Sequence, residues 1–183
     1  YLDDYRYKAL QNLTRARFFA VQNLVKEKQR FLNYLFKKYS TMAQEKIFSD
    51  TFSTTALAVY EKFESAEALA EMDLQQLTDF IIKNGKNRFP DPDAVAKAIQ
   101  KAARSSYRLP KTVNDSVNQV LSISISSIRA MEQQIKAFDK AIAEQMALIP
   151  NTLTSIKGIG PVFSAGIIAE IGDINRFPNQ AAL

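Results

Sequence analysis

Two long stretches of the sequence place an apolar residue at every third or fourth position, or at sums of these steps, with no glycine or proline inside either stretch. This spacing predicts two amphipathic helices. Pro110 and Pro150 bracket the second helix, which would extend about 60 Å at 1.5 Å per residue. Helices of this length rarely stand alone, so we expect an antiparallel coiled coil, formed within one chain or between two. The first stripe is Leu10, Leu13, Val21, Leu24, Phe31, Leu35 and Tyr39, and the second is Val113, Val117, Leu121, Ile128, Met131, Ile135, Phe138, Ile142, Met146 and Ile149.

The segment between the stripes has the start and stop signals of a small helical insert. Ser65, Asp73 and Asp91 are placed to cap the starts of short helices, and Pro92 suits a first helical turn. The Asn-Gly pair at 84–85 offers a left-handed stop for the helix that follows Asp73. The predicted helices of the insert are 53–63, 65–70, 74–83 and 91–107.

The sequence therefore predicts an all-α chain in four parts. Two long helices, 1–39 and 110–149, form the coiled-coil arms, 40–109 is the helical insert, and 150–183 is a carboxy-terminal helix-hairpin-helix. Ser and Ile alternate briefly at 122–128, but their place inside a helical stripe favours a helix over a strand.

The chain contains no Cys and no His, which excludes several kinds of site. Disulfides, thiolate or imidazole metal sites, Cys nucleophiles and His-dependent triads are impossible within it. Asp91 with Asp93, and Glu170 with Asp173, have spacings that would suit a metal. Helix capping explains the first pair better, and a solvated helix end near Arg176 explains the second. No catalytic residue and no metal ligand is therefore predicted in this chain.

No apolar run approaches the roughly 20 residues of a membrane span, and no signal-peptide pattern is present. We therefore expect a cytoplasmic protein without a membrane partner. The sequence opens on Tyr1 without an initiator Met and stops at Leu183 within a pattern, so we also expect it to be part of a longer protein.

Positive charge is concentrated in two stretches of the chain. Residues 1–39 hold nine Lys and Arg against three acids, and residues 83–111 hold eight against two, although the whole chain is only +5. Such clustering is typical of a surface that binds a nucleic-acid backbone, and two solvated helix faces are the alternative. The candidate binding residues of the first stretch are Arg15, Arg17, Lys26, Lys28, Arg30, Lys37 and Lys38.

A glycine turn near the carboxy terminus carries the strongest functional signal. Two short predicted helices, 151–156 and 162–171, flank the turn sequence at 157–161. Glycine permits backbone angles that other residues avoid and lets another backbone come close. The amides of the turn and of the following helix form a positive concave site suited to a phosphate. The predicted contacts are Lys157, Gly158, Ile159, Gly160 and Val162, and we expect Ile156 and Ile159 to anchor the hairpin inside.

The turn also has a plainer interpretation, in which its glycines serve only the close packing of two helices. The lysine beside the phosphate-facing amides favours backbone binding over this alternative. Two serines near the turn are interpreted as structural: Ser155 as a helix-start residue, and Ser164 as a packing or backbone-contact residue.

The residues around the turn form a familiar pattern, made of Ile156, Gly158, Ile159, Gly160, the run 169–174, Arg176 and Phe177. The pattern resembles the carboxy-terminal transposase domain of the DEDD-type insertion-sequence transposases, also known as bridge-RNA-guided recombinases. Leu10, Leu13, Arg15 and Arg17, with the long helix after them, resemble the central coiled coil of that family. Lys157 departs from the pattern, since many relatives carry Pro there.

The resemblance implies a mechanism for the parent protein. Its relatives combine a RuvC-like domain, whose four acids bind a divalent metal such as Mg²⁺, with a Ser nucleophile that forms a covalent intermediate with DNA. Both would lie outside this chain, the acids before Tyr1 and the Ser beyond Leu183. The resemblance also implies DNA as a partner, with a guide RNA as a second candidate. The apolar stripes predict a homo-oligomer formed through the long helices.

The leading hypothesis is therefore a fragment of a transposase that supplies nucleic-acid backbone binding and dimerisation in the transposition of an insertion sequence. One alternative is a non-catalytic helix-hairpin-helix module of a repair or chromosome-associated protein. Another is a structural coiled-coil protein without a nucleic-acid role.

Overall fold

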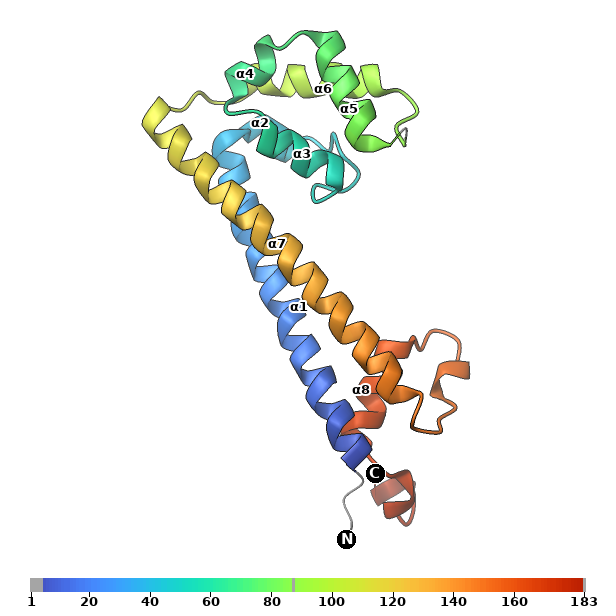
Figure 1. Cartoon of the computed structure of the whole chain (residues 1–183). Helices are drawn as coiled ribbons and strands as arrows, with labels where there is room; N and C mark the ends of the chain where they lie inside the picture. The colour runs from blue at the N-terminus through green and yellow to red at the C-terminus, as the bar shows by residue number, and fades with distance from the viewer. Residues whose placement is uncertain (1–4, 87, 183) are drawn as a thin grey trace. The chain divides into compact units, whose positions relative to one another are not determined.

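The computed structural model describes residues 5–86 and 88–182, and all the regular structure within these ranges is helical (Figure 1), which confirms the all-α prediction. The chain divides into two compact units, which are described separately. Residues 1–26 and 129–183 form the turn unit, and residues 27–128 form the insert unit. The α-helices are α1 Tyr5–Lys38, α2 Ser40–Gln44, α3 Thr54–Lys62, α4 Ala66–Glu71, α5 Leu74–Gly85, α6 Pro92–Ser105, α7 Lys111–Met146 and α8 Pro161–Ile171, and the short 3₁₀ helices are η1 Leu153–Ser155, η2 Ile174–Arg176 and η3 Gln180–Ala182.

In the turn unit, the first half of α1 and the second half of α7 lie antiparallel. The guanidinium of Arg6 donates to the carbonyl of Leu148 at 2.9 Å, and the Gln145 amide donates to the carbonyl of Arg6 at 3.4 Å. Further along α1, Arg17 pairs with Asp139, which lies earlier on α7. The arms of this unit therefore pair within one chain. A small core joins them to α8 and consists of Leu10, Ile142, Ile149, Ala165, Ile168 and Ala169.

In the insert unit, the second half of α1 and the first half of α7 share an aromatic core with the insert. The ring centroid of Phe31 lies 5.5 Å from that of Phe52 and 6.1 Å from that of Tyr60. The Ser124 hydroxyl on α7 donates to the carboxylate of Glu27 on α1. Within the insert, α6 packs against α2, α4 and α5, and α3 packs against α5. The buried apolar residues that α7 adds to this unit are Val117, Leu121, Ile125 and Ile128.

The predicted helix starts of the insert are confirmed. Ser65, Asp73 and Asp91 each accept a hydrogen bond of 2.9–3.0 Å from the backbone amide three residues later. Pro92 is the first residue of α6, and the serine-isoleucine alternation at 122–128 lies within α7. These signals act over one helical turn, so they can be recognised in the sequence alone.

Several predicted helix limits were wrong by a few residues. The helix α1 ends at Lys38 because Tyr39 leaves the helical conformation, and α7 ends at Met146, before the expected Ile149. The helix α6 ends at Ser105. Val113, the first position of the second stripe, is 45% exposed and does not belong to the core.

Gly85 does not provide the predicted left-handed stop. It is the buried last residue of α5, and the left-handed conformation falls one residue later, at Lys86, with φ of 50°. A Cβ placed on Gly85 would lie 2.6 Å from the ring of Phe89. Glycine is therefore needed at this position because an aromatic ring packs directly on the backbone.

Candidate nucleic-acid interface

The glycine turn joins a single 3₁₀ turn to α8. The α-helix predicted at 151–156 is absent, since only η1 at 153–155 is helical there, so a helix-hairpin-helix is not confirmed. Gly158 has φ of +95°, which an L-residue rarely adopts, whereas Gly160 has an ordinary φ of −77°. A Cβ on Gly160 would meet no atom within 4 Å. Only one of the two glycines is therefore required by backbone geometry.

The turn is more exposed than the sequence suggested. Ile156 is 50% exposed, so the expectation that it anchors the hairpin inside was wrong, while Ile159 is half-buried. Lys157, Gly158 and Gly160 are exposed. The turn keeps its shape through a hydrogen bond of 3.1 Å from the Ile159 amide to the Ile156 carbonyl. Three of the five predicted phosphate contacts are thus open to solvent, and Ile159 and Val162 are partly buried.

The amino-terminal end of α8 carries no side-chain cap. Gly160 stands at the cap position without a side-chain acceptor, and Pro161, the first helical residue, has no N–H. The amides of Val162 and Phe163 are then among the groups that the helix itself leaves without an acceptor. Since these amides lie at the positive end of the helix dipole, they can donate hydrogen bonds to an anion.

An apolar groove of about 1300 Å³ runs between α1 and α8 in the turn unit. Phe18 and Phe19 on α1 face it with 58% and 60% of their surfaces exposed, and Phe163 on α8 is 64% exposed. Gly160 and Pro161 also line it, so the groove adjoins the glycine turn. This groove was not predicted from the sequence. Phe18 and Phe19 lie off the buried stripe of α1, which was the available signal.

The charged residues that line the groove form two ion pairs, Arg15 with Glu170 and Arg17 with Asp139. The guanidinium of Arg15 donates to both oxygens of the Glu170 carboxylate, at 2.9 and 2.8 Å, and the Gln11 amide donates to the same carboxylate at 3.2 Å. The hydrogen bond from Arg15 lowers the pKa of Glu170, and partial desolvation of the carboxylate opposes this shift. Arg17, also in the groove lining, pairs with Asp139. The charge of both predicted phosphate contacts is thus shared with an acid.

Glu170 lies at a solvated helix end, as expected, but its ion-pair partner was not predicted. Glu170 pairs with Arg15, which is 155 residues earlier, and the guanidinium of Arg176 instead lies 4.6 Å from the ring centroid of Phe177. The carboxylate of Asp173, the other acid of this predicted pair, accepts hydrogen bonds from the backbone amide and the side chain of Asn175.

The other basic residues of α1 that were predicted to bind nucleic acid lie near an acid, near an aromatic ring or in solvent. Arg30 pairs with Glu27 at 3.2 Å, and the amine of Lys28 lies 4.8 Å from the ring centroid of Phe52. The amine of Lys37 lies 4.8 Å from the ring centroid of Tyr34, and Lys26 is exposed. Counting charges in the sequence therefore overstates the positive potential of α1.

Lys38 does not belong to the predicted basic surface, because its side chain is only 3% exposed. Its amine donates to the carbonyls of Tyr60 and Phe63, so it stabilises the carboxy-terminal end of α3. Burial lowers the pKa of this amine to about 8, an effect that nearby Glu64 opposes. The error has a physical cause, since the insert packs over the residue that ends α1.

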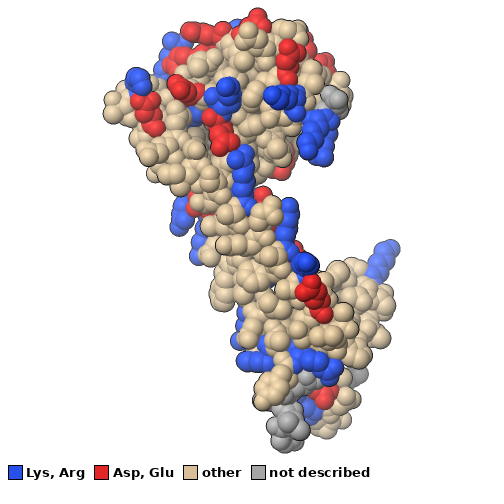
Figure 2. Space-filling view, viewed as in Figure 1, with Lys and Arg blue, Asp and Glu red and all other residues tan. Residues whose placement is uncertain are grey.

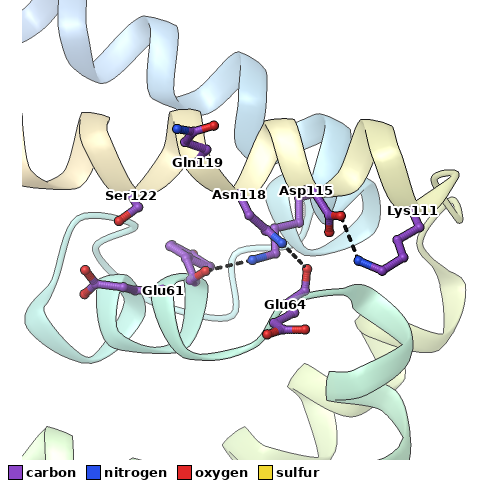
Figure 3. A pocket seen from close by; sticks show the side chains of 9 residues that line it. Glu61, Glu64, Lys111, Asp115, Asn118, Gln119 and Ser122 are labelled. Carbon is purple, nitrogen blue, oxygen red and sulfur yellow. Dashed lines mark hydrogen bonds and ion pairs between the residues drawn. The ribbon is translucent and has the colours of Figure 1, made fainter.

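A polar pocket of about 410 Å³ lies beside Lys38 in the insert unit (Figure 3). Lys111 pairs with Asp115 across 2.7 Å, and the Asn118 amide donates to the carbonyl of Glu64 at 2.7 Å (Figure 3). The side-chain oxygen of Asn118 is buried and has no hydrogen-bond partner among the described residues. The pocket offers polar groups of both signs and no preference for an anion.

The acidic pairs considered as metal ligands have structural partners. Asp91 caps α6, and Asp93 pairs with Lys97 across 2.6 Å. Within residues 5–86 and 88–182, no three acidic side chains gather closely enough to hold a metal ion.

None of the helices in the described ranges combines the length and apolar content that a bilayer span requires.

Comparison with known proteins places the glycine turn within a recognised segment. The family model of the IS116/IS110/IS902 transposases matches residues 151–183, which contain η1, the turn and α8. An uncharacterized 44.8 kDa protein of the insertion element IS116 from Streptomyces clavuligerus is 25% identical over 172 residues. The match covers 88% of this chain and 40% of that relative, so the chain spans less than half of the relative's length. No solved structure matches. These findings do not favour a repair or chromosome-associated module.

Proposed function

We propose that this chain is part of a transposase of the IS116/IS110/IS902 family and binds a nucleic-acid backbone during the transposition of an insertion sequence. The binding residues are those of the glycine turn and the start of α8: Lys157, Gly158, Ile159, Gly160 and Val162. DNA is the expected partner, and a guide RNA is a second candidate for the same chemistry.

The uncapped start of α8 carries this proposal. The exposed cation of Lys157, an open glycine at position 160 and the unsatisfied amides of Val162 and Phe163 converge in the segment that the family model matches. A phosphate needs hydrogen-bond donors, positive potential and room for a close approach, and this segment supplies all three.

Strand cleavage and rejoining belong to the longer parent in this proposal. The four acids and the nucleophilic Ser that the family resemblance implies would come from outside these 183 residues, and so would the ligands of a Mg²⁺ ion. No metal-dependent step is derived for this chain. The cytoplasm is the proposed location, since the DNA of a bacterial insertion sequence is found there.

We also propose that α1 mediates self-association through its outer face. Phe18, Val25 and Leu32 follow one another at steps of seven residues, Phe36 follows four residues later, and all four are exposed. A seven-residue step is the coiled-coil repeat, so a second copy can cover these side chains.

The binding proposal is tested with one substitution on each of two glycines. Gly160→Ala and Gly166→Ala both add a Cβ that meets no atom within 4 Å, and neither glycine has a positive φ. Fold and stability are therefore expected to survive both changes. If a phosphate backbone approaches the turn, Gly160→Ala weakens binding of a labelled DNA duplex or RNA hairpin in fluorescence anisotropy, whereas Gly166→Ala does not. Equal affinity of the two variants would reject the turn as a binding site.

A further inference from the structure

The outer face of α6 in the insert unit carries a continuous row of cations. Lys97, Lys101 and Arg104 follow at steps of four and three residues, which places them on one side of the helix. Arg108 comes four residues later, just beyond the helix end, and all four side chains are exposed. The opposite side of α6 is buried through Ala96, Ile99, Gln100, Ala102 and Ala103.

The middle of this row keeps its charge free. Lys97 pairs with Asp93 across 2.6 Å, and Arg108 lies 3.4 Å from the carboxylate of Glu67. Lys101 and Arg104 make no ion pair with any of the described residues. In α1, by contrast, Arg15, Arg17 and Arg30 are each paired with an acid.

Acidic and basic side chains alternate over much of the insert on the face shown in Figure 2. A polyanion is repelled by the acids and attracted by the bases, so it binds best where cations follow one another without an acid between them. The outer face of α6 meets this condition from Lys97 to Arg108, because Ala, Ile, Gln, Ser and Tyr are the other residue types there.

An exposed aromatic ring lies within the same row. Tyr107, between Arg104 and Arg108, is 75% exposed, and its backbone amide donates to the Ser40 hydroxyl at 3.0 Å. The backbone is thus anchored to α2 while the ring remains in solvent. A fixed aromatic face beside cations is the combination that binds unpaired bases, which stack on the ring while the cations neutralise the phosphates.

We propose that Lys101, Arg104, Tyr107 and Arg108, here called the α6 surface, bind single-stranded nucleic acid. The phosphates contact the three cations and one base stacks on Tyr107. RNA and DNA share this chemistry, and the site is separate from the glycine turn, which lies in the other unit.

The test measures binding of labelled oligothymidylate, oligouridylate and a DNA duplex of equal length to the 183-residue chain. We expect tighter binding of the single strands than of the duplex. Replacing Lys101, Arg104 and Arg108 with Ala should lower the slope of log affinity against log salt by about 1.4 to 2, because each lost phosphate contact of a single strand removes roughly 0.7 and the charge of Arg108 is shared with Glu67. Tyr107→Ala should weaken single-strand binding about tenfold without changing the salt slope.

A matched variant controls for net charge. Replacing the exposed Lys46, Lys62 and Lys136 with Ala removes the same charge from scattered positions, so it should change affinity much less. Circular dichroism melts verify that each variant is folded. An unchanged salt slope in the α6 variant, or an equal loss in the scattered variant, would overturn the proposal, and so would equal binding of duplex and single strand with no effect of Tyr107→Ala. The losses caused by Gly160→Ala and by the α6 variant should be independent of each other, because the glycine turn and the α6 surface lie in different units.

The oligonucleotide that binds more tightly shows whether RNA or single-stranded DNA is the preferred ligand of the α6 surface. Tighter binding of oligouridylate points to contacts with the RNA 2′-hydroxyl, and tighter binding of oligothymidylate points to displaced DNA. Either result supports the α6 surface, provided that the same substitutions abolish the preference.

Discussion

The guanidinium of Arg15 on α1 donates two hydrogen bonds to the carboxylate of Glu170 on α8, although the two residues are 155 positions apart in the chain. Both residues line the apolar groove, and the pair neutralises a cation that was predicted from the sequence to bind nucleic acid. Both side chains are more than half exposed, so their attraction is screened and adds little to stability.

Removing the acid should therefore release the cation for a phosphate. We expect Glu170→Gln to tighten DNA binding and to steepen the salt dependence of log affinity by about one unit. Arg15→Ala alone should change the salt slope little, because the charge it removes is already paired. Anisotropy titrations of both single variants and the double variant measure the effect. If Arg15 takes over the phosphate, the double variant loses the gain that Glu170→Gln produces, and a gain that persists in the double variant would exclude this role.

The burial of the Lys38 amine should make the free energy of unfolding depend on pH in the alkaline range. Burial lowers its pKa to about 8 in the folded protein, while the unfolded chain titrates near the usual 10.5. Between these values the unfolded state binds more protons, so the free energy of unfolding rises with pH, by roughly 3 kcal/mol across the full window. Urea unfolding at intervals from pH 7 to 10 measures this rise.

Tyr39 and Tyr60, which neighbour Lys38, set the pH above which the free energy of unfolding stops rising. Burial raises the pKa of Tyr39 and of Tyr60 above the ordinary value near 10, so the stability that they contribute is complete below pH 10 and is lost above it. The profile should therefore climb from pH 8 and fall again beyond pH 10. Lys38→Met keeps the buried aliphatic chain without the charge and should flatten the climb. The same climb in this variant would assign it to other groups.

Gly85, the one glycine of the insert, is predicted to tolerate no larger residue without a loss of stability. An added Cβ would lie 2.6 Å from the Phe89 ring, so Gly85→Ala should destabilise the protein by about 1–3 kcal/mol, the usual cost of overpacking. Gly85→Ala combined with Phe89→Leu should recover part of this loss. Thermal melts of the single and double variants test the prediction, and a single variant as stable as the wild type would show that the ring moves aside freely.

The outer face of α1 predicts the oligomeric state. Replacing Phe18, Val25 and Leu32 with Ser should convert a self-associated chain into a monomer, as measured by light scattering over a range of concentrations. Val113, Val120 and Ile123 on α7 are also exposed, so their replacement with Ser is a matched loss of apolar surface and should leave the assembly intact. A wild-type chain that stays monomeric at high concentration contradicts self-association altogether.

The features that could be predicted from the sequence are those that depend on neighbours within a helical turn. The caps at Ser65, Asp73 and Asp91 join a side chain to an amide three residues away, and the stripes of α1 and α7 reflect the period of one helix. The glycine turn was located for the same reason, although the helix expected before it is a 3₁₀ turn.

The features that could not be predicted depend on contacts between distant segments. The role of Lys38 follows from the carbonyls at the end of α3, and the partner of Glu170 comes from the opposite end of the chain. Charge counting treats every Lys and Arg as solvated, so it marked residues 1–39 and 83–111 alike as basic. Only the ion pairs distinguish Arg15, Arg17 and Arg30 of α1 from Lys101 and Arg104 of α6, which form no ion pair with the described residues.

Ser164 gives a final prediction on the turn unit, where its hydroxyl is fully buried and has no hydrogen-bond partner among the described residues. Burial excludes the direct backbone contact that was one of its two predicted roles and leaves packing. An unsatisfied buried hydroxyl costs free energy, so Ser164→Ala should stabilise the protein by about 1 kcal/mol and raise Tm by roughly 2–4 °C. Ser155→Ala is the control, since that exposed hydroxyl donates to the Thr152 carbonyl at 2.7 Å and its loss should not stabilise. A lower Tm for Ser164→Ala would mean that the hydroxyl has a bound water or another partner in solution.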